Sequence, residues 1–66
     1  MEEIKLTFGV SVFDKWTTTT VLLEEGYSLE EIDRAIAVVL NNKSQFAHMN
    51  YYYGFEACVR SVLERG

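Results

Sequence analysis

The chain is only 66 residues long, and this shortness limits its fold to one small hydrophobic core. A domain of that size buries only about 60% of the surface that its unfolded chain exposes, so its margin of stability is thin. Disulfides, a metal or oligomerisation usually supply the missing stability. Cys58 is the only cysteine and His48 the only histidine, so the chain can build neither an internal disulfide nor a four-ligand zinc site. We therefore expect a single small domain, residues 1–66, without a cofactor or metal, for which oligomerisation is an open possibility.

Composition and charge narrow the class of protein. Hydrophobic residues make up 48% of the chain, which excludes a disordered protein. The net charge is −4, and the six basic residues are scattered along the chain. Nucleic-acid binding draws much of its affinity from clustered Lys and Arg side chains, so we expect neither a nucleic-acid partner nor an anionic membrane surface.

Two further patterns concern where the protein is located. The N-terminus opens with acidic residues and lacks the basic-then-apolar order of a signal peptide. The longest apolar run, residues 35–40, is far shorter than the ~20 residues of a membrane span. A lone thiol suits a reducing compartment, so we expect a cytoplasmic protein.

Residues 3–13 alternate as in a β-strand with one buried face. Every second side chain is apolar, at Ile4, Leu6, Phe8, Val10 and Val12. A lone strand leaves its backbone donors and acceptors unpaired. We expect it to pair with the same strand of a second chain across a two-fold axis, which gives a homodimer. A short segment around residues 44–50 is the weaker alternative partner.

Three helices are expected after this strand. Asp14 is a suitable N-cap for a helix from Lys15, with Trp16, Leu22 and Leu23 on its apolar stripe and a stop at Gly26. The sequence Ser28-Leu29-Glu30-Glu31 is a capping box that starts the second helix, residues 29 to about 40. Residues 43–50 lack a clean period and are expected to connect it to a third helix, from about 51 to 64.

The expected fold is therefore α+β and helix-dominated, with one N-terminal β-strand followed by three α-helices. The helix periods predict one core, made of Phe8, Leu22, Ile32, Ile36, Val39, Phe55, Val59 and Val62.

Short stretches resemble several known families. Residues 25–36, Glu-Gly-Tyr-Ser-Leu-Glu-Glu-Ile-Asp-Arg-Ala-Ile, resemble the first turn and second helix of ubiquitin-associated domains, and also a stretch of mercury-resistance-type transcription regulators. The order of a strand and then helices resembles ribbon-helix-helix repressors, in which paired N-terminal strands read DNA. What the shared stretch contains is a glycine stop and a capping box, which mark a helix boundary in many folds, so we assign no family.

The functional prediction is a non-catalytic protein-binding module of adaptor or inhibitor type, such as a small phage or bacterial accessory protein supplies. The candidate contact residues fall into two sets, the tyrosines Tyr51, Tyr52 and Tyr53 and an acidic edge of Glu24, Glu25, Glu30 and Asp33. The alternative is a dimeric ribbon-helix-helix-like regulator that binds DNA through Lys5 and Thr7. No nucleophile–base pair has a recognisable context, so we do not expect an enzyme.

Overall fold

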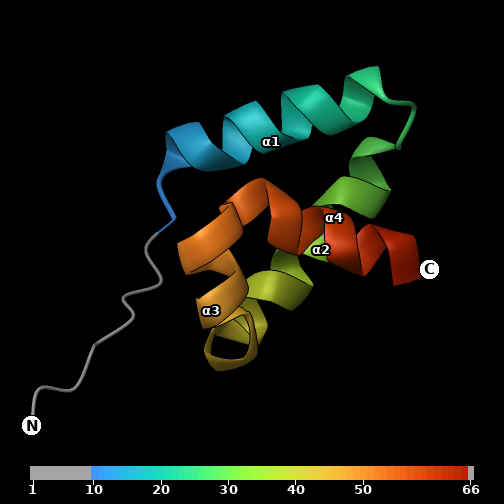
Figure 1. Cartoon of the computed structure of the whole chain (residues 1–66). Coiled ribbons are helices and arrows are strands. Elements are labelled where there is room, and N and C mark those ends of the chain that lie inside the picture. Colours follow the sequence, from blue (N-terminus) through green and yellow to red (C-terminus); the bar gives the residue numbers. More distant parts are fainter. Residues whose placement is uncertain (1–9, 66) are drawn as a thin grey trace, which may run out of the picture.

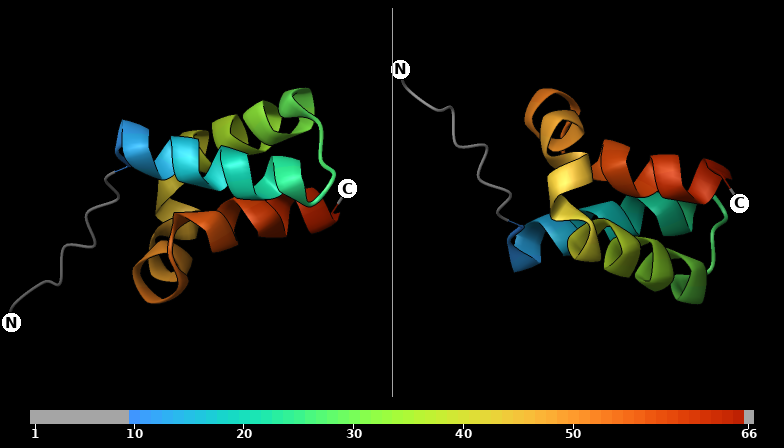
Figure 2. Two further views of the ribbon diagram at one scale, coloured as in Figure 1. Left: turned by 90° about the horizontal axis from the view of Figure 1, so that it is seen from above. Right: turned by 90° about the horizontal axis from the view of Figure 1, so that it is seen from below.

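The computed structural model describes residues 10–65, which form four α-helices (Figure 1). They are α1 (Val12–Glu24), α2 (Leu29–Asn41), α3 (Lys43–Tyr53) and α4 (Phe55–Arg65). The most extensive contact joins α2 to α4, and both α1 and α3 contact this pair without contacting each other. Figure 2 shows from above and below that α1 and α3 lie on different sides of the pair. None of the helices among these residues is long and apolar enough to cross a membrane.

The predicted α+β class is wrong, because residues 10–65 form helices and contain no strand. Residues 3–9 of the expected strand lie outside the described residues, whereas Val12 and Phe13 belong to α1. The cause is a capping box: the Ser11 hydroxyl accepts a hydrogen bond from the Asp14 amide at 3.0 Å, and the Asp14 carboxylate accepts one from the Ser11 amide at 3.2 Å. Helix α1 therefore begins three residues before the predicted start, and Asp14 belongs to its first turn.

The predicted boundaries of α2 are confirmed. The Glu31 amide donates to the Ser28 hydroxyl at 3.1 Å, and the Ser28 amide donates to the Glu31 carboxylate at 3.2 Å. Before this box, α1 ends at Glu24, and Gly26 adopts a positive φ of 105° that reverses the chain. This tight turn brings α2 back against α1, as Figure 1 shows.

The C-terminal half differs from the prediction, because it contains two helices where one was expected. Residues 43–50, predicted to be a connection, belong to α3 together with the three tyrosines. Gly54 has a φ of 92°, a conformation that L side chains rarely adopt, and it ends α3 before α4 begins at Phe55. The break lets both helices face the core, with Phe46 buried on α3 and Phe55 on α4.

The core forms one cluster that draws on all four helices. The predicted members in α1, α2 and α4 are buried, except that Val62 is partly buried and Phe8 lies outside the described residues. Phe46 was missed, because its segment was not expected to be helical. The buried apolar cluster is Leu22, Ile32, Ala35, Ile36, Val39, Phe46, Phe55, Cys58 and Val59.

The two neighbouring leucines of α1 test how the helix packs. Leu22 is fully buried, whereas Leu23 is 44% exposed. Leu22→Ala should lower the free energy of unfolding by about 2–5 kcal/mol, because it leaves a cavity in the core. Leu23→Ala, the matched control, should cost less than about 1 kcal/mol. Urea denaturation of dilute protein measures both, and equal losses would contradict the orientation of α1.

Candidate functional site

The three tyrosines form the last turn of α3 and are all exposed. Their exposed fractions are 64% for Tyr51, 69% for Tyr52 and 77% for Tyr53. Helix α3 is anchored in the core by Phe46, one and a half turns earlier, so its final turn extends beyond the core before Gly54 ends it. None of the three tyrosines packs into the core, so all three predicted contact residues of this set are accessible.

Two of these rings hold each other in place. The Tyr51 and Tyr52 rings contact edge to face, with their centroids 5.0 Å apart and an interplanar angle of 88°. Such contacts reduce the freedom of both side chains, so less entropy is lost when a partner covers them. The tyrosine cluster, Tyr51–Tyr53, is thus a partly ordered aromatic surface.

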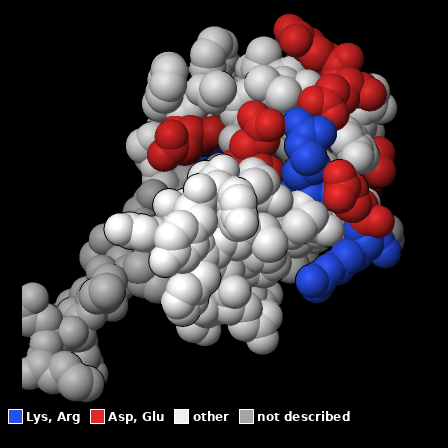
Figure 3. Space-filling model, viewed as in Figure 1, with Lys and Arg blue, Asp and Glu red and all other residues white. Residues whose placement is uncertain are grey.

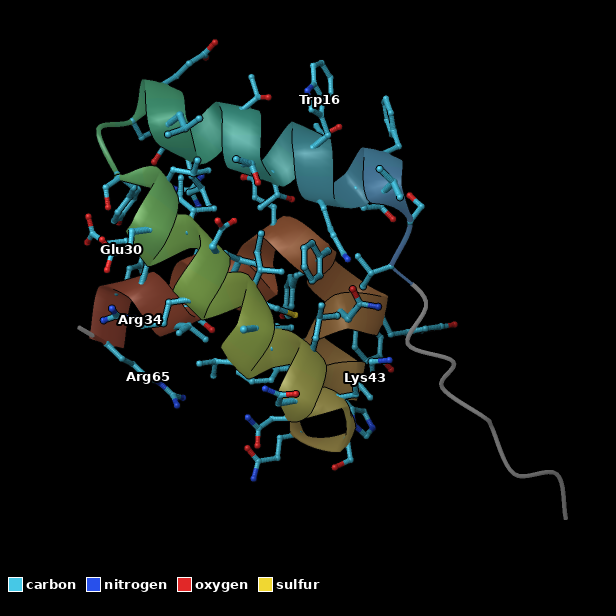
Figure 4. The ribbon with its side chains drawn as sticks, turned by 180° about the vertical axis from the view of Figure 1, so that it is seen from behind. Trp16, Glu30, Arg34, Lys43 and Arg65 are labelled. Atoms are coloured by element: carbon cyan, nitrogen blue, oxygen red, sulfur yellow. The ribbon has the colours of Figure 1, made fainter. Side chains whose placement is uncertain are left out.

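A second group of exposed aromatic side chains lies on α1. Phe13 is 69% exposed and Trp16 is 64% exposed, and their ring centroids are 6.2 Å apart. Figure 4 shows Trp16 pointing away from the other helices. We expected Trp16 on the core-facing stripe, and the structure shows that it lies on the opposite side of the helix from the buried Thr18 and Leu22.

Sequence reasoning missed this aromatic face of α1 as a candidate contact surface. The signal was present, since Phe13, Trp16, Thr20 and Leu23 recur at spacings of three, four and three. It was hidden by the apolar alternation of residues 4–12, which favoured a strand up to Phe13.

Two of the four residues of the acidic edge, Glu25 and Glu30, form internal ion pairs. Arg60 of α4 donates to both oxygens of Glu25, at 2.5 and 2.7 Å, and also to Glu56 at 3.0 Å. Glu30 pairs with Arg34 one helical turn away, at 3.4 Å on the exposed face of α2, as Figure 4 shows. These pairs neutralise part of the acidic charge that was predicted to attract a basic partner.

Glu24 and Asp33, the remaining members of the acidic edge, are exposed and make no ion pair among residues 10–65. They are the parts of the predicted acidic surface that stay available to a partner.

The two predicted contact sets lie at different ends of the molecule. The acidic edge surrounds the α1–α2 turn, and the tyrosine cluster ends α3 at the opposite end (Figures 1 and 2). Figure 3 shows a similar division: most charged side chains on this face gather over the end with the α1–α2 turn, while uncharged side chains cover the region of α3. The structure therefore does not join the two sets into one small contact surface.

The side chains that could support chemistry are separated by burial. His48 is exposed on α3, whereas Cys58 is fully buried in the core and its thiol donates weakly to the Phe46 and Gly54 carbonyl oxygens, at 3.8 and 3.6 Å. Burial raises the pKa of the Cys58 thiol, so the reactive thiolate is disfavoured. Within residues 10–65 no three His, Cys, Asp or Glu side chains are grouped so that they could hold a metal ion.

A shallow groove of about 210 Å³ lies between α2 and α4. Its polar members already have partners, since Glu31 caps α2 and Arg34 pairs with Glu30. The groove is lined by Glu31, Arg34, Ala35, Val38, Val62 and Leu63.

Comparison with known proteins gives no match to a family model, a curated protein or a solved structure. The function must therefore be argued from the surface itself.

The ion pair between Glu25 and Arg60 predicts a defined pH dependence. Hydrogen bonds from Arg60 and its positive charge hold the pKa of Glu25 below its ordinary value of 4.5. A carboxyl group with a lowered folded-state pKa stabilises the fold above its unfolded pKa, and this contribution is lost as the pH falls through the folded value. Arg60→Gln should therefore raise the pKa of Glu25 and make stability fall less steeply below pH 4.5.

Carboxyl NMR titration and acid denaturation measure these two effects. Arg34→Gln is the matched control, because it removes the more exposed pair and should leave the titration midpoint of Glu25 unchanged. An unchanged midpoint in Arg60→Gln would show that the contact between Glu25 and Arg60 does not persist in solution.

The buried thiol gives a second test. Cys58 should react with iodoacetamide at pH 8 at least about tenfold more slowly in the native protein than in urea, because the reagent cannot reach it and the thiolate is disfavoured. Mass spectrometry over a time course measures the rate, and equal rates would contradict the burial of Cys58 in the core.

Proposed function

We propose that this protein is a non-catalytic protein-binding module of adaptor or inhibitor type, which uses exposed aromatic side chains to contact its partner. The observation that carries the proposal is that five of the eight aromatic residues between positions 10 and 65 are exposed. Exposed aromatic groups on a small protein mark interaction surfaces, because water solvates them poorly and a partner gains by covering them. The five are Phe13, Trp16, Tyr51, Tyr52 and Tyr53.

The tyrosine cluster is the part of this surface that best suits a protein partner. Tyrosine combines a large apolar area with a polar hydroxyl, and it loses little rotamer freedom on binding. Lys43 is the only Lys, Arg, Asp or Glu in α3, so the cluster has a mostly uncharged border that a partner can desolvate at low cost.

The acidic edge is the second candidate surface for a partner. Glu24 and Asp33 are exposed there, and they would favour a basic partner. Since Glu25 and Glu30 already form ion pairs, we assign the edge a smaller contribution to affinity than the tyrosine cluster.

The DNA-binding alternative gains no support from the described residues. Lys5 and Thr7 lie outside them, and the four-helix order differs from the strand-and-helices order that the resemblance to ribbon-helix-helix repressors requires. The net charge of −4 also opposes binding to phosphates.

The absence of catalysis and a cytoplasmic location are further parts of the proposal. Burial keeps the Cys58 thiol away from substrates, and His48 on the surface of α3 has no partner of a catalytic kind in the described hydrogen bonds. A lone buried thiol is also compatible with a reducing compartment.

The triple variant Tyr51→Ser, Tyr52→Ser, Tyr53→Ser tests the proposal. A partner is first captured with the wild-type chain from a lysate of its host, identified by mass spectrometry and titrated by calorimetry. The tyrosine variant should bind that partner at least about tenfold more weakly, because aromatic anchors dominate interface energies.

The matched control is Glu24→Gln, Glu30→Gln, Asp33→Asn, which spares the pair between Glu25 and Arg60 and should change the affinity by less than about threefold. If the acidic-edge variant loses affinity and the tyrosine variant does not, the contact surface is the acidic edge. Unchanged affinity in both variants would refute both surfaces.

A further inference from the structure

Helix α1 has two apolar faces, and the other residues between positions 10 and 65 cover only one of them. Thr18 and Leu22 face the core with exposed fractions of 3% and 0%. On the opposite side, four residues recur at spacings of three, four and three, which is the seam pattern of helices that pair along their length. This outer seam consists of Phe13, Trp16, Thr20 and Leu23.

The seam carries no charge, and its polar donors are the Trp16 indole N–H and the Thr20 hydroxyl. The Thr20 hydroxyl donates to the Trp16 carbonyl oxygen at 2.9 Å, and the neighbouring Thr17 hydroxyl donates to the Phe13 carbonyl oxygen at 2.8 Å. Both hydroxyl donors are therefore paired within α1, and a second surface can cover these threonines without leaving an unpaired donor.

We propose that the outer seam of α1 packs antiparallel against the same seam of a second copy of this chain, about a two-fold axis that passes beside position 18. The inference rests on the proposed function, since it assigns one part of the exposed aromatic surface to self-association. It leaves the tyrosine cluster free for a different partner, because α3 makes no contact with α1.

Side-chain size makes the antiparallel arrangement self-complementary. With the axis at position 18, Trp16 of one copy lies opposite Thr20 of the other, and Phe13 lies opposite Leu23. Every layer then joins a larger side chain to a smaller one, and the two-fold axis repeats each layer. A parallel pair would place Trp16 against Trp16 and Thr20 against Thr20, so that one layer would be overfilled and another would hold a void.

Charge favours the same arrangement. Acidic residues gather around the C-terminal end of α1 and the following turn, as Figure 3 shows. A parallel pair would bring these acidic ends together, whereas an antiparallel pair separates them by roughly the ~20 Å length of a 13-residue helix. That separation exceeds the Debye length of ~8 Å at physiological salt, so the repulsion is largely screened.

The area that the outer seam can bury indicates how stable the proposed dimer is. Aromatic side chains bury roughly 150–250 Å² each when fully covered. With Phe13 and Trp16 about two-thirds exposed and Leu23 contributing less, the pair would bury roughly 500–800 Å² in total, below the ~1,200–2,000 Å² of stable interfaces. We therefore expect a weak, reversible dimer.

An experiment with oppositely charged variants tests whether a second copy of the chain covers the outer seam. It also tests whether position 13 of one copy lies opposite position 23 of the other. The variants are Phe13→Glu and Leu23→Lys, which stand at exposed positions and suit the helix dipole, with the acid near the N-terminus and the base near the C-terminus. Sedimentation velocity between about 5 and 500 µM should show a concentration-dependent dimer for the wild-type chain and at least about tenfold weaker dimerisation for each variant alone.

Mixing the two variants at low salt should restore dimers. In the mixed antiparallel pair, the Glu at position 13 of one copy lies opposite the Lys at position 23 of the other. The second layer keeps the wild-type contact between Leu23 of the first copy and Phe13 of the second. About 0.5 M salt should reverse this recovery. Far-UV circular dichroism checks that both variants keep their helices.

Two results would overturn the inference. One is a wild-type chain that stays monomeric at about 500 µM. The other is a wild-type dimer whose variants do not recover on mixing, which would exclude the pairing of position 13 with position 23. The tyrosine triple variant separates this inference from the proposed function, since it should dimerise like the wild type. If it dimerises normally and also keeps full affinity for the captured partner, only the tyrosine contact fails.

Discussion

The contact between α2 and α4 is the interaction on which the rest of the fold depends. The apolar stripe of α2, from Ile32 to Val39, meets Cys58 and Val59 of α4 in one buried cluster. Helices α1 and α3 do not contact each other, so among the described helices each packs against this pair alone. Gly54 makes the contact possible, because its positive φ ends α3 and allows the last helix to turn back toward α2.

A core this small can cover only one side of α1. Leu22 faces the α2–α4 pair, and nothing among the described residues covers the aromatic side of the same helix. Among residues 10–65 no further element covers Phe13 and Trp16, which are about two-thirds exposed. This exposed aromatic face is the feature on which the proposed association with another molecule rests.

Burial and charge together divide the surface into regions with different properties. The ion pairs of Arg60 with Glu25 and Glu56 link the α1–α2 turn to α4, so charge at that end stabilises contacts within the domain. The last turn of α3 has no such role, and its three tyrosines are exposed in mostly uncharged surroundings. This division is why we propose that the aromatic side chains recognise the partner, and why Glu25 of the acidic edge has a mainly structural role.

The sequence by itself determined the features that depend on neighbouring residues: the capping box that starts α2, the stop at Gly26 and the apolar periods that predicted most of the core. The prediction from sequence was wrong where two local patterns favour different secondary structures. Alternation through Val12 suggested a strand, but the pairing of Ser11 with Asp14 starts a helix there. Likewise, no period predicted α3, which Phe46 holds by burial against distant residues. Only the tertiary structure decided which side of α1 and which tyrosines are exposed, because exposure depends on packing between helices far apart in the sequence.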